Sequence, residues 1–287
     1  MLRKEIDAVE AIDCSTILTS TTATALKADG IVAVGRYLGY ETQGWSKSLT
    51  PDELKVIQGA GQSVFLIWES NPTTVGYFSY SQGVSDAQLA LEEAAYLGAP
   101  NRTAIYFTVD FDAQTSDMAA IIEYFSGVRD GLNGQYLVGA YGSYSVMQAL
   151  QASSYAPDKY WQTYAWSNGM VFSGNDIYQY QNDVTLEGIV VDLDTIQYNS
   201  GCWPEIGEDN MFANLVIYDE GPDVRAAQYL ADYLKAPIVS TDNVTPELLA
   251  CATNKYKVGG SAYPGAQLIS GSDRYETMSE VLKFMGI

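Results

Sequence analysis

Two aspartates end a stretch of the sequence that has the composition of a β-strand. In the segment 106–112 (YFTVDFD), aromatic and β-branched residues lead to Asp110 and Asp112. Because side chains alternate between the faces of a strand, both carboxyls are expected on one face, with Cα atoms roughly 6–7 Å apart. Like charges this close raise the pKa of one carboxyl, which can then donate a proton while the other stays ionised. The spacing indicates acid/base chemistry, whereas exposed aspartates at a strand end are the simpler structural interpretation.

Further acidic and amide side chains stand where other strands are expected to end. They are Asp13, Glu69, Gln179, Gln181, Asp192 and Asp194. In a barrel of parallel strands, catalytic groups lie at the carboxyl ends of the strands. Polar residues at so many strand ends are harder to explain by chance than one pair of aspartates. We therefore predict one acidic site built from several strands.

Strand-like and helix-like segments alternate through the first two hundred residues. The eight expected strands are 11–13, 31–38, 63–69, 103–112, 137–141, 160–166, 177–181 and 189–194. Helical segments are clear after the first five strands and weak after the last three. Repeated βα units of this length form parallel sheets, and eight of them can close into a barrel. The predicted fold class is α/β, an irregular (β/α)8 TIM-like barrel, with an open doubly wound sheet as the alternative.

The alternation stops near residue 200, where glycine, proline and acidic residues cluster. We expect a catalytic barrel over residues 1–200, a linker over 201–212 and a small C-terminal α/β module over 213–287. In the module, strands are predicted at 214–218, 237–240, 256–260 and 267–269, and helices at 222–234 and 273–284. A unit of this size buries little core, and oligomerisation is one way in which it can gain stability. A homo-oligomer formed through the module is therefore one expectation.

Charge and composition exclude several classes of function. The chain has 15 basic and 35 acidic residues, a net charge of −20, so neither nucleic acid nor an anionic membrane is an expected partner. It has no histidine, which excludes Ser-His-Asp and Cys-His catalysis and histidine-ligated zinc. The three cysteines are far apart and indicate neither a disulfide framework nor a metal cluster. We therefore expect no metal and no cofactor.

An ordered set of short motifs runs along the predicted barrel. In sequence order the motifs are DCS (13–15), GRYL (35–38), LTP (49–51), WE (68–69), DA (86–87), GAP (98–100), YFTVDFD (106–112), YFSGV (124–128), GAYGSY (139–144), WQT (161–163), YQY (178–180) and VDLD (191–194). Over roughly residues 8–198, this set resembles the glycoside-hydrolase-like domain of unknown function 1906, a relative of the glycoside hydrolase family 25 lysozymes. The resemblance implies a barrel that hydrolyses a β-1,4 glycosidic bond.

The C-terminal module carries a second resemblance. Its segments APIV (236–239), VGG (258–260) and GSDRYET (271–277) are similar to the type 2 cell-wall-binding repeat of Gram-positive surface proteins. Within the last segment, Ser272 or Asp273 is expected to cap the final helix. A wall hydrolase joined to a wall-binding module, with no export signal visible, is the organisation of phage endolysins. The resemblance implies peptidoglycan and wall polysaccharide of a Gram-positive host as partners, and a protein that waits in the host cytoplasm until holin-mediated release.

The lysozyme relatives carry Asp-x-Glu where this chain has Asp110-x-Asp112, and their glutamate is the general acid. The resemblance therefore implies that Asp112, or Glu69 on the neighbouring strand, protonates the leaving oxygen. Asp110 would stabilise the oxocarbenium-like centre or orient the substrate, and Asp13 and Asp192 would hold hydroxyls or tune the acid. The identity of the acid stays open, because an aspartate is one methylene shorter than a glutamate.

Side chains that could contact sugar are aromatic, amide and charged residues near the expected strand ends. The residues assigned to substrate binding are Arg36, Trp68, Tyr141, Trp161, Gln162, Gln179, Gln181, Asp192 and Asp194, with Trp166 as a further cleft candidate. Burial in the barrel is the alternative for the rings, and pairing with buried carboxylates is the alternative for Arg36. Two other functions also stay open, an inert wall-glycan-binding protein and a glucosaminidase.

Overall fold

The computed structural model describes residues 9–206, 212–245, 248–249 and 252–287. The chain consists of two compact units, Met1–Ile206 and Gly207–Ile287, each with a hydrophobic core of its own. Cys14 and Cys202 carry buried free thiols, and Cys251 lies outside the described residues. Among the described helices, none is both long and apolar enough to cross a lipid bilayer.

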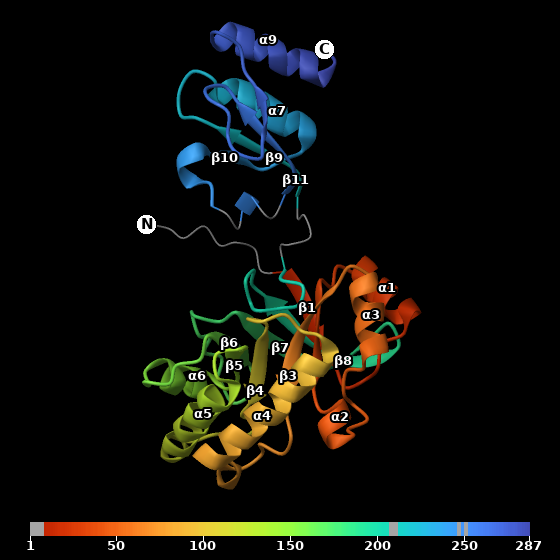
Figure 1. The fold of residues 1–287 in the computed structure, drawn as a ribbon, viewed down its shortest axis with the longest axis vertical. Coiled ribbons are helices and arrows are strands. Elements are labelled where there is room, and N and C mark those ends of the chain that lie inside the picture. Colours follow the sequence, from red (N-terminus) through yellow and green to blue (C-terminus); the bar gives the residue numbers. More distant parts are fainter. Residues whose placement is uncertain (1–8, 207–211, 246–247, 250–251) are drawn as a thin grey trace. The chain divides into compact units, whose positions relative to one another are not determined.

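A closed barrel forms the first unit, as predicted (Figure 1). Its strands, each hydrogen-bonded to the next, are β1 (Val9–Asp13), β2 (Ala33–Tyr37), β3 (Ser63–Trp68), β4 (Ala104–Thr108), β5 (Leu137–Gly142), β6 (Lys159–Thr163), β7 (Ile177–Leu186) and β8 (Ile189–Ile196). Strands β1 to β7 are parallel, but β8 is antiparallel to both of its neighbours, β7 and β1.

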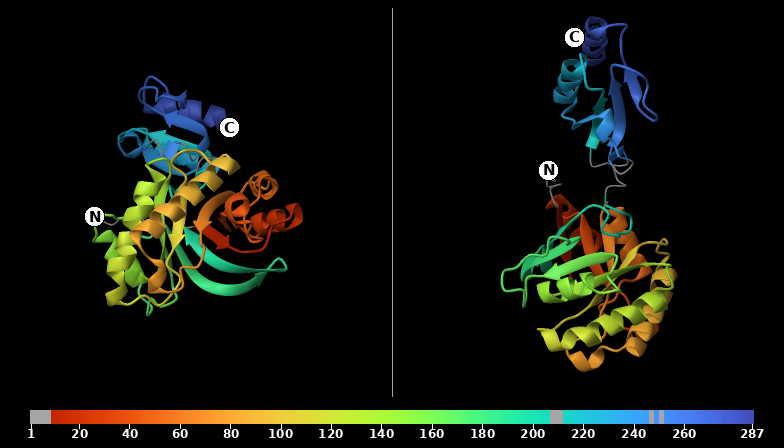
Figure 2. Two further views of the ribbon diagram at one scale, coloured as in Figure 1. Left: turned by 60° about the horizontal axis from the view of Figure 1, so that its bottom comes forward. Right: turned by 90° about the vertical axis from the view of Figure 1, so that its left-hand side faces the viewer.

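The reversal of β8 follows from its short connection to β7. Glu187 and Gly188 form the turn, and both have positive φ angles, 50° and 80°, as in a tight β-hairpin. Figure 2 shows the two strands running side by side out to this turn. The expectation of a parallel eighth strand is therefore wrong, because a two-residue turn leaves no length for a crossover helix.

Helices follow the first five strands, again as predicted. They are α1 (Ser20–Ala28), α2 (Tyr40–Gln43), α3 (Pro51–Gly59), α4 (Tyr80–Leu97), α5 (Met118–Leu132) and α6 (Tyr144–Gln151), with short 3-10 turns at Val75–Tyr77 and Thr115–Asp117. The start of α3 shows why these segments are helical: Pro51 opens it, and the Thr50 side chain accepts the Glu53 N–H at 3.2 Å. In the described part of the barrel, no helix stands between β6 and β7.

Aromatic rings fill the middle of the barrel. Phe65, Tyr106 and Trp161 point inward from three strands and meet edge to face, with ring centroids 5.2, 5.9 and 6.1 Å apart. Gly35 makes room for them, since a Cβ at that position would lie 2.4 Å from the Phe65 ring. This buried layer is the floor below the polar side chains at the carboxyl ends of the strands.

Residues 201–206 pack against the barrel and are not a linker. Trp203 exchanges backbone hydrogen bonds with Val64 of β3, at 2.8 and 2.9 Å, and Cys202 is buried. The segment thereby pairs backbone groups at the amino end of β3 that would otherwise be buried without partners. The linker prediction is wrong for these residues, and 207–211 lie outside the described part of the chain.

A four-stranded parallel sheet with helices packed on it forms the second unit, which agrees with the predicted α/β module. Its strand order is β10 (Ile238–Ser240), β9 (Phe212–Tyr218), β11 (Ala252–Val258) and β12 (Gln267–Ile269), and the helices are α7 (Val224–Leu234) and α9 (Arg274–Met285). A 3-10 turn lies at Thr241–Asn243. Asp273 caps α9 as predicted, accepting the backbone N–H groups of Tyr275 and Glu276 at 2.8 and 2.9 Å.

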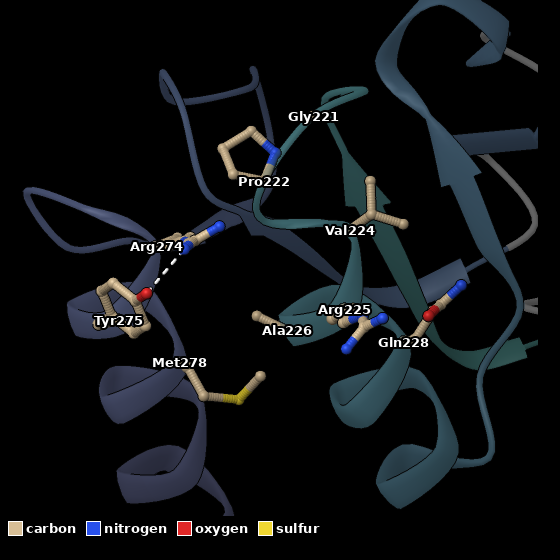
Figure 3. Close-up of a pocket in the computed structure, with 9 residues that line it drawn as sticks. All are labelled: Gly221, Pro222, Val224, Arg225, Ala226, Gln228, Arg274, Tyr275 and Met278. Atoms are coloured by element: carbon tan, nitrogen blue, oxygen red, sulfur yellow. Dashed lines mark hydrogen bonds between the residues drawn. The ribbon is translucent and has the colours of Figure 1, made fainter.

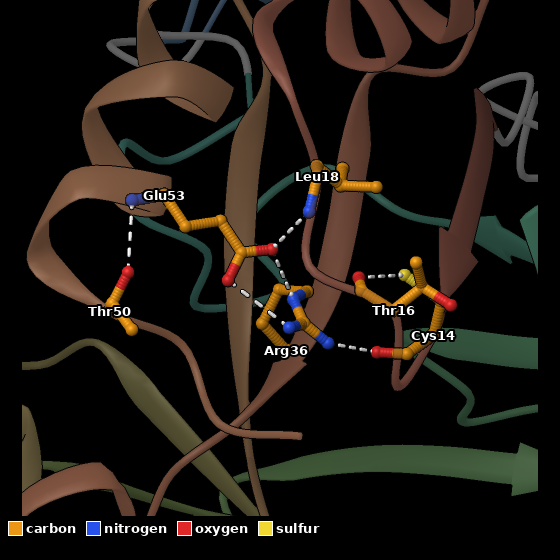
Figure 4. Close-up of polar contacts among 6 residues, drawn as sticks. All are labelled: Cys14, Thr16, Leu18, Arg36, Thr50 and Glu53. Atoms are coloured by element: carbon orange, nitrogen blue, oxygen red, sulfur yellow. Dashed lines mark hydrogen bonds and ion pairs between the residues drawn. The ribbon is translucent and has the colours of Figure 1, made fainter. Parts of the chain in front are cut away.

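A buried ion pair joins the barrel to α3 (Figure 4). Arg36 points outward from β2, and its Nε and Nη2 lie 2.9 and 3.1 Å from the two carboxylate oxygens of Glu53. Glu53 also accepts the Leu18 N–H at 2.8 Å, while Arg36 donates to the Cys14 carbonyl. Both side chains are closed off from solvent. The structural alternative for Arg36 is therefore confirmed, and its assignment to substrate binding is wrong.

Removing one partner of this pair should destabilise the barrel, because it leaves a buried charge without a counter-charge. For Glu53→Gln we expect the free energy of unfolding to fall by about 3–5 kcal/mol, measured by urea unfolding with tryptophan fluorescence. The matched control is Asp52→Asn, whose exposed carboxylate pairs with Lys55 and should matter by less than about 1 kcal/mol. A loss for Glu53→Gln as small as that of the control would contradict this role.

Candidate active site

Polar side chains at the carboxyl ends of the strands enclose a cavity of about 260 Å³, called here the acidic cavity. Every strand of the barrel contributes to its lining, directly or through the residues that follow it. The lining residues are Asp13, Tyr37, Ile67, Glu69, Thr108, Asp110, Tyr141, Trp161, Gln179, Asn182 and Asp192. Four of them are carboxylic acids, and none of these described lining residues is lysine or arginine. Acidic residues from several strands thus meet in one place. Asp13, Glu69 and Asp110 stand at or just after strand ends as predicted, whereas Asp192 comes from the amino half of the antiparallel β8.

Gln179 holds two of the acids together in this cavity. Its Nε2 donates to Asp13 Oδ2 at 2.8 Å and to Asp192 Oδ2 at 3.2 Å, and its Oε1 accepts the Tyr141 hydroxyl at 2.8 Å. Asp13 and Asp192 are also paired residues of the antiparallel β1–β8 ladder. The amide thus bridges two carboxyls that would otherwise repel each other.

Burial keeps protons on the deepest carboxyls. Asp194 lies below the cavity, fully buried, and accepts the Trp161 Nε1–H at 2.8 Å. Burial, and after it the neighbouring Asp13 carboxyl, raises the pKa of Asp194 well above its usual range. Burial and then the charge of Asp192 raise the pKa of Asp13 as well. This part of the site therefore retains a proton at neutral pH.

Asp110 and Glu69 form the outer part of the acidic cavity. They follow the adjacent parallel strands β4 and β3, which brings them to the same end of the barrel. Burial and then the Glu69 charge raise the pKa of Asp110, against the opposing effect of Lys47. Glu69 forms an ion pair with Lys47, with Oε1 2.6 Å from Nζ. A carboxyl with a raised pKa, beside a second carboxyl that is ion-paired, is suited to acid catalysis with charge stabilisation.

Asp112 does not share the acidic cavity with Asp110. The strand was predicted to reach residue 112, but β4 ends at Thr108. The alternation of side chains along a strand therefore does not determine the direction of either aspartate side chain. The Asp112 side chain is exposed, and its backbone carbonyl accepts a hydrogen bond from Gln114 Nε2 at 2.9 Å. The expected carboxyl pair on one strand face is therefore wrong.

Two residues assigned to substrate binding face away from the cavity. Trp68 packs against Trp45 on the helix side of β3, with ring centroids 5.5 Å apart. Gln162 accepts the Phe172 N–H and donates to the Met170 carbonyl, both at 2.7 Å, and so holds the loop after β6. Each is one position from a cavity residue, which places it on the opposite face of its strand.

A β-bulge explains a further difference from the prediction. The pairing of β7 with β8 shifts between Gln179 and Gln181, and Gln181 is exposed while Asn182 lines the acidic cavity. Trp166 is also exposed, outside the cavity lining. Four lining residues were not predicted from the sequence, namely Tyr37, Ile67, Thr108 and Asn182. Alternation along the predicted strand could have found Tyr37, but no local signal marks the bulge.

The predicted site residues that do line the acidic cavity come from seven positions. They are Asp13, Glu69, Asp110, Tyr141, Trp161, Gln179 and Asp192. Within the described chain, no group of three or more histidine, cysteine, aspartate or glutamate side chains is arranged to hold a metal ion.

Comparison with protein families matches residues 24–200 to the Rv2525c-like, glycoside hydrolase-like domain. The match covers more than half of the chain. The chain belongs to the Rv2525c-like glycoside hydrolase-like family. The matched segment of this glycoside hydrolase-like domain contains β2 to β8, and thus every residue of the acidic cavity except Asp13.

Two relatives of this glycoside hydrolase-like chain are the uncharacterized proteins FadG and YbfG of Bacillus subtilis strain 168. FadG is 37% identical over 142 residues and YbfG 35% identical over 186 residues, which is 47% and 60% of this chain. Each match covers 25% of the relative, so the chain matches about a quarter of the length of these proteins.

A solved structure similar to this chain is that of the Tat-secreted protein Rv2525c of Mycobacterium tuberculosis in complex with L-tartrate. The TM-score is 0.59 at 19% sequence identity, covering 69% of this chain and 100% of the other. At this identity, the likeness concerns the fold.

The raised pKa values of Asp13 and Asp194 predict that protonation stabilises the barrel. The folded state binds these protons more tightly than the unfolded state, whose aspartates titrate near 3.8. Their contribution is therefore full at low pH and is lost as the pH rises from about 4 through neutrality. Asp194→Asn should remove part of this decline in stability with pH. The free energy of unfolding of the variant, relative to that of wild type, should therefore increase as the pH rises.

Urea unfolding of both proteins at a series of pH values measures this difference. Asp52→Asn, at an exposed side chain, corrects for the loss of one negative charge from the chain. A difference between Asp194→Asn and wild type that stays constant or declines with rising pH would contradict the protonated state of the pair.

Proposed function

We propose that the chain is a lysozyme-like hydrolase that cleaves a β-1,4 glycosidic bond of peptidoglycan. The observation that carries the proposal is the meeting of Asp13, Glu69, Asp110 and Asp192 in one cavity, at the end of the barrel where the parallel strands have their carboxyl ends. Glycosidases use one carboxyl that holds a proton and a second that is ionised. Membership of a glycoside hydrolase-like family supports the reaction. The sequence resemblance to the glycoside hydrolase family 25 lysozymes supports the substrate.

Asp110 is the proton donor in this proposal. Its carboxyl lines the acidic cavity, and its raised pKa lets it hold a proton until the leaving oxygen accepts it. Glu69, paired with Lys47, supplies the negative charge beside the oxocarbenium-like centre. These roles differ from those implied by the sequence, because Asp112 lies outside the cavity.

The Asp13–Gln179–Asp192 group orients the substrate. Its amide and carboxyl atoms form one hydrogen-bonded chain with the Tyr141 hydroxyl, and these groups can exchange partners with sugar hydroxyls or an N-acetyl group. The aromatic floor under them closes the barrel side of the cavity to water, which strengthens these contacts.

The C-terminal unit is proposed to attach the protein to the wall. A groove of about 830 Å³ lies between the first turns of α7 and α9, as Figure 3 shows, and it is lined by Gly221, Pro222, Val224, Arg225, Ala226, Gln228, Arg274, Tyr275 and Met278. Arg274 stacks on the exposed Tyr275 ring at 4.7 Å and donates to its hydroxyl at 2.6 Å. Two arginines and an exposed ring suit a hydroxyl-rich, anionic polymer.

An endolysin-type role combines these two proposals. The protein would collect in the cytoplasm of a Gram-positive host and reach the peptidoglycan after a holin opens the membrane. Self-association through the C-terminal unit would then increase wall attachment by avidity.

A wall-glycan-binding protein without catalysis is the second candidate. One observation favours it: the residue at the position of the general acid in the lysozyme relatives, Asp112, is exposed and outside the acidic cavity. A glucosaminidase would use the same carboxyls to cleave the other β-1,4 glycosidic bond of the wall glycan.

Release of new reducing ends from purified Gram-positive walls tests the proposal. Wild-type protein should release them, and Asp110→Asn should lower the rate by about 100-fold or more, because it loses general acid catalysis. Glu69→Gln should also lower the rate, whereas Asp112→Asn should stay close to wild type. Circular dichroism of each variant shows whether the fold is retained.

The same assay separates the alternatives. Loss of activity in Asp112→Asn with retention in Asp110→Asn would return the acid role to Asp112. Wild-type protein that binds several types of wall and releases no reducing ends would be a binding protein. Mass spectrometry of the new reducing-end sugar distinguishes a muramidase from a glucosaminidase.

A further inference from the structure

A second cavity, of about 500 Å³, adjoins the acidic cavity and is called here the side cavity. Two loops line it: Gly44, Trp45, Ser46 and Lys47 follow α2, and Glu69 and Ser70 follow β3. Glu69 lines both cavities, so a chain-like ligand that fills the acidic cavity can continue into the side cavity. The proposed hydrolysis leaves the side cavity without a role.

The loop that carries Trp45 and Lys47 is fixed by its packing. The Trp45 ring covers Gly39, where a Cβ would lie 2.5 Å from the ring, and Gly39 has a φ of 107° that favours glycine. Just after Lys47, the Ser48 hydroxyl donates to the Leu38 carbonyl at 3.0 Å. The fold thus determines where the indole and the ammonium group stand.

Lys47 is the one cation among the described residues that line these two cavities. Its Nζ lies 2.6 Å from Glu69 Oε1 and 4.0 Å from the centroid of the Tyr37 ring. An ammonium group has three N–H donors, of which Glu69 accepts one and the ring face attracts another. Because the Lys47 side chain is 29% exposed, a further donor can reach a ligand.

We propose that the side cavity binds the carboxylate-bearing part of a wall glycan, with Lys47 in contact with the carboxylate and Trp45 beside the sugar. The inference rests on the proposed function and adds the substrate class, namely glycans whose sugars or peptide stems carry free carboxylates. The carboxyls of the acidic cavity repel such a ligand unless a cation stands where its charge lies. A neutral glycan gains nothing from Lys47.

Competition for Lys47 gives the inference a distinctive consequence. Glu69 and the carboxylate of the ligand would bind the same ammonium group. Removal of the lysine charge should therefore weaken binding of carboxylated glycans, and removal of the Glu69 charge should strengthen it. A purely structural role of the ion pair would make both changes act in the same direction.

Calorimetric titration of the full chain with three soluble glycans tests the side cavity without requiring cleavage. The glycans are a disaccharide with the muramic acid carboxylate, the same disaccharide with its peptide stem, and neutral chitotetraose. Lys47→Gln should weaken binding of a carboxylated glycan by about tenfold or more, as for a lost charge-assisted hydrogen bond. Binding of chitotetraose should change by less than about twofold. Lys47→Arg should restore most of the affinity, and Glu69→Gln should increase it.

The pattern of losses decides the inference. If Lys47→Gln weakens binding of the peptide-free disaccharide, Lys47 contacts the carboxylate of the sugar. If it weakens binding of the stem-bearing ligand alone, Lys47 contacts a carboxylate of the peptide stem. Equal weakening of charged and neutral glycans, no weakening, or no binding of carboxylated glycans would overturn the inference. If the protein releases no reducing ends from walls but still prefers carboxylated glycans, the proposed hydrolase activity is wrong and the proposed binding site in the side cavity is retained.

Discussion

The free-energy cost of burying carboxyl groups governs the barrel of this protein. A carboxylate that leaves water needs a counter-charge, hydrogen-bond donors or a proton. The acidic cavity gathers four such groups, with Asp194 below them. Gln179 donates to Asp13 and Asp192, and the Trp161 indole donates to Asp194. Protons retained on the deepest acids reduce the remaining charge of the cavity, and the proton proposed for acid catalysis belongs to Asp110 in its outer part.

The positions of the cations follow from this constraint. Arg36 could have neutralised the interior, yet it points outward and pairs with Glu53, where it fixes α3 to the barrel. Lys47 stands at the edge, where it pairs with Glu69 and opposes the rise in the pKa of Asp110 that burial and the Glu69 charge cause. A cation among the deepest carboxyls would favour their ionised forms, and the protons that reduce the charge of the cavity would be lost.

The sequence was sufficient for the closed barrel, the small α/β unit and most of the acidic cavity. Alternating segments and polar residues at strand ends are local signals, and they located Asp13, Glu69 and Asp110. The failures come from strand ends and from a bulge, whose positions no local pattern in the sequence marks. Strand β4 ends early, which leaves Asp112 exposed, and a bulge in β7 places Asn182 instead of Gln181 in the acidic cavity. Strand alternation then turns each such shift into a side chain on the wrong face.

The most direct test of this account is a pH titration of the aspartate carboxyl carbons by NMR, with assignments from single Asn variants. The carboxyls of Asp13, Asp110 and Asp194 should titrate above the ordinary aspartate value of 3.8. Asp194→Asn should also shift the titration of Asp13, because the two are neighbours. If all three titrate near 3.8, the cavity holds no retained protons, and the proposed acid chemistry is wrong.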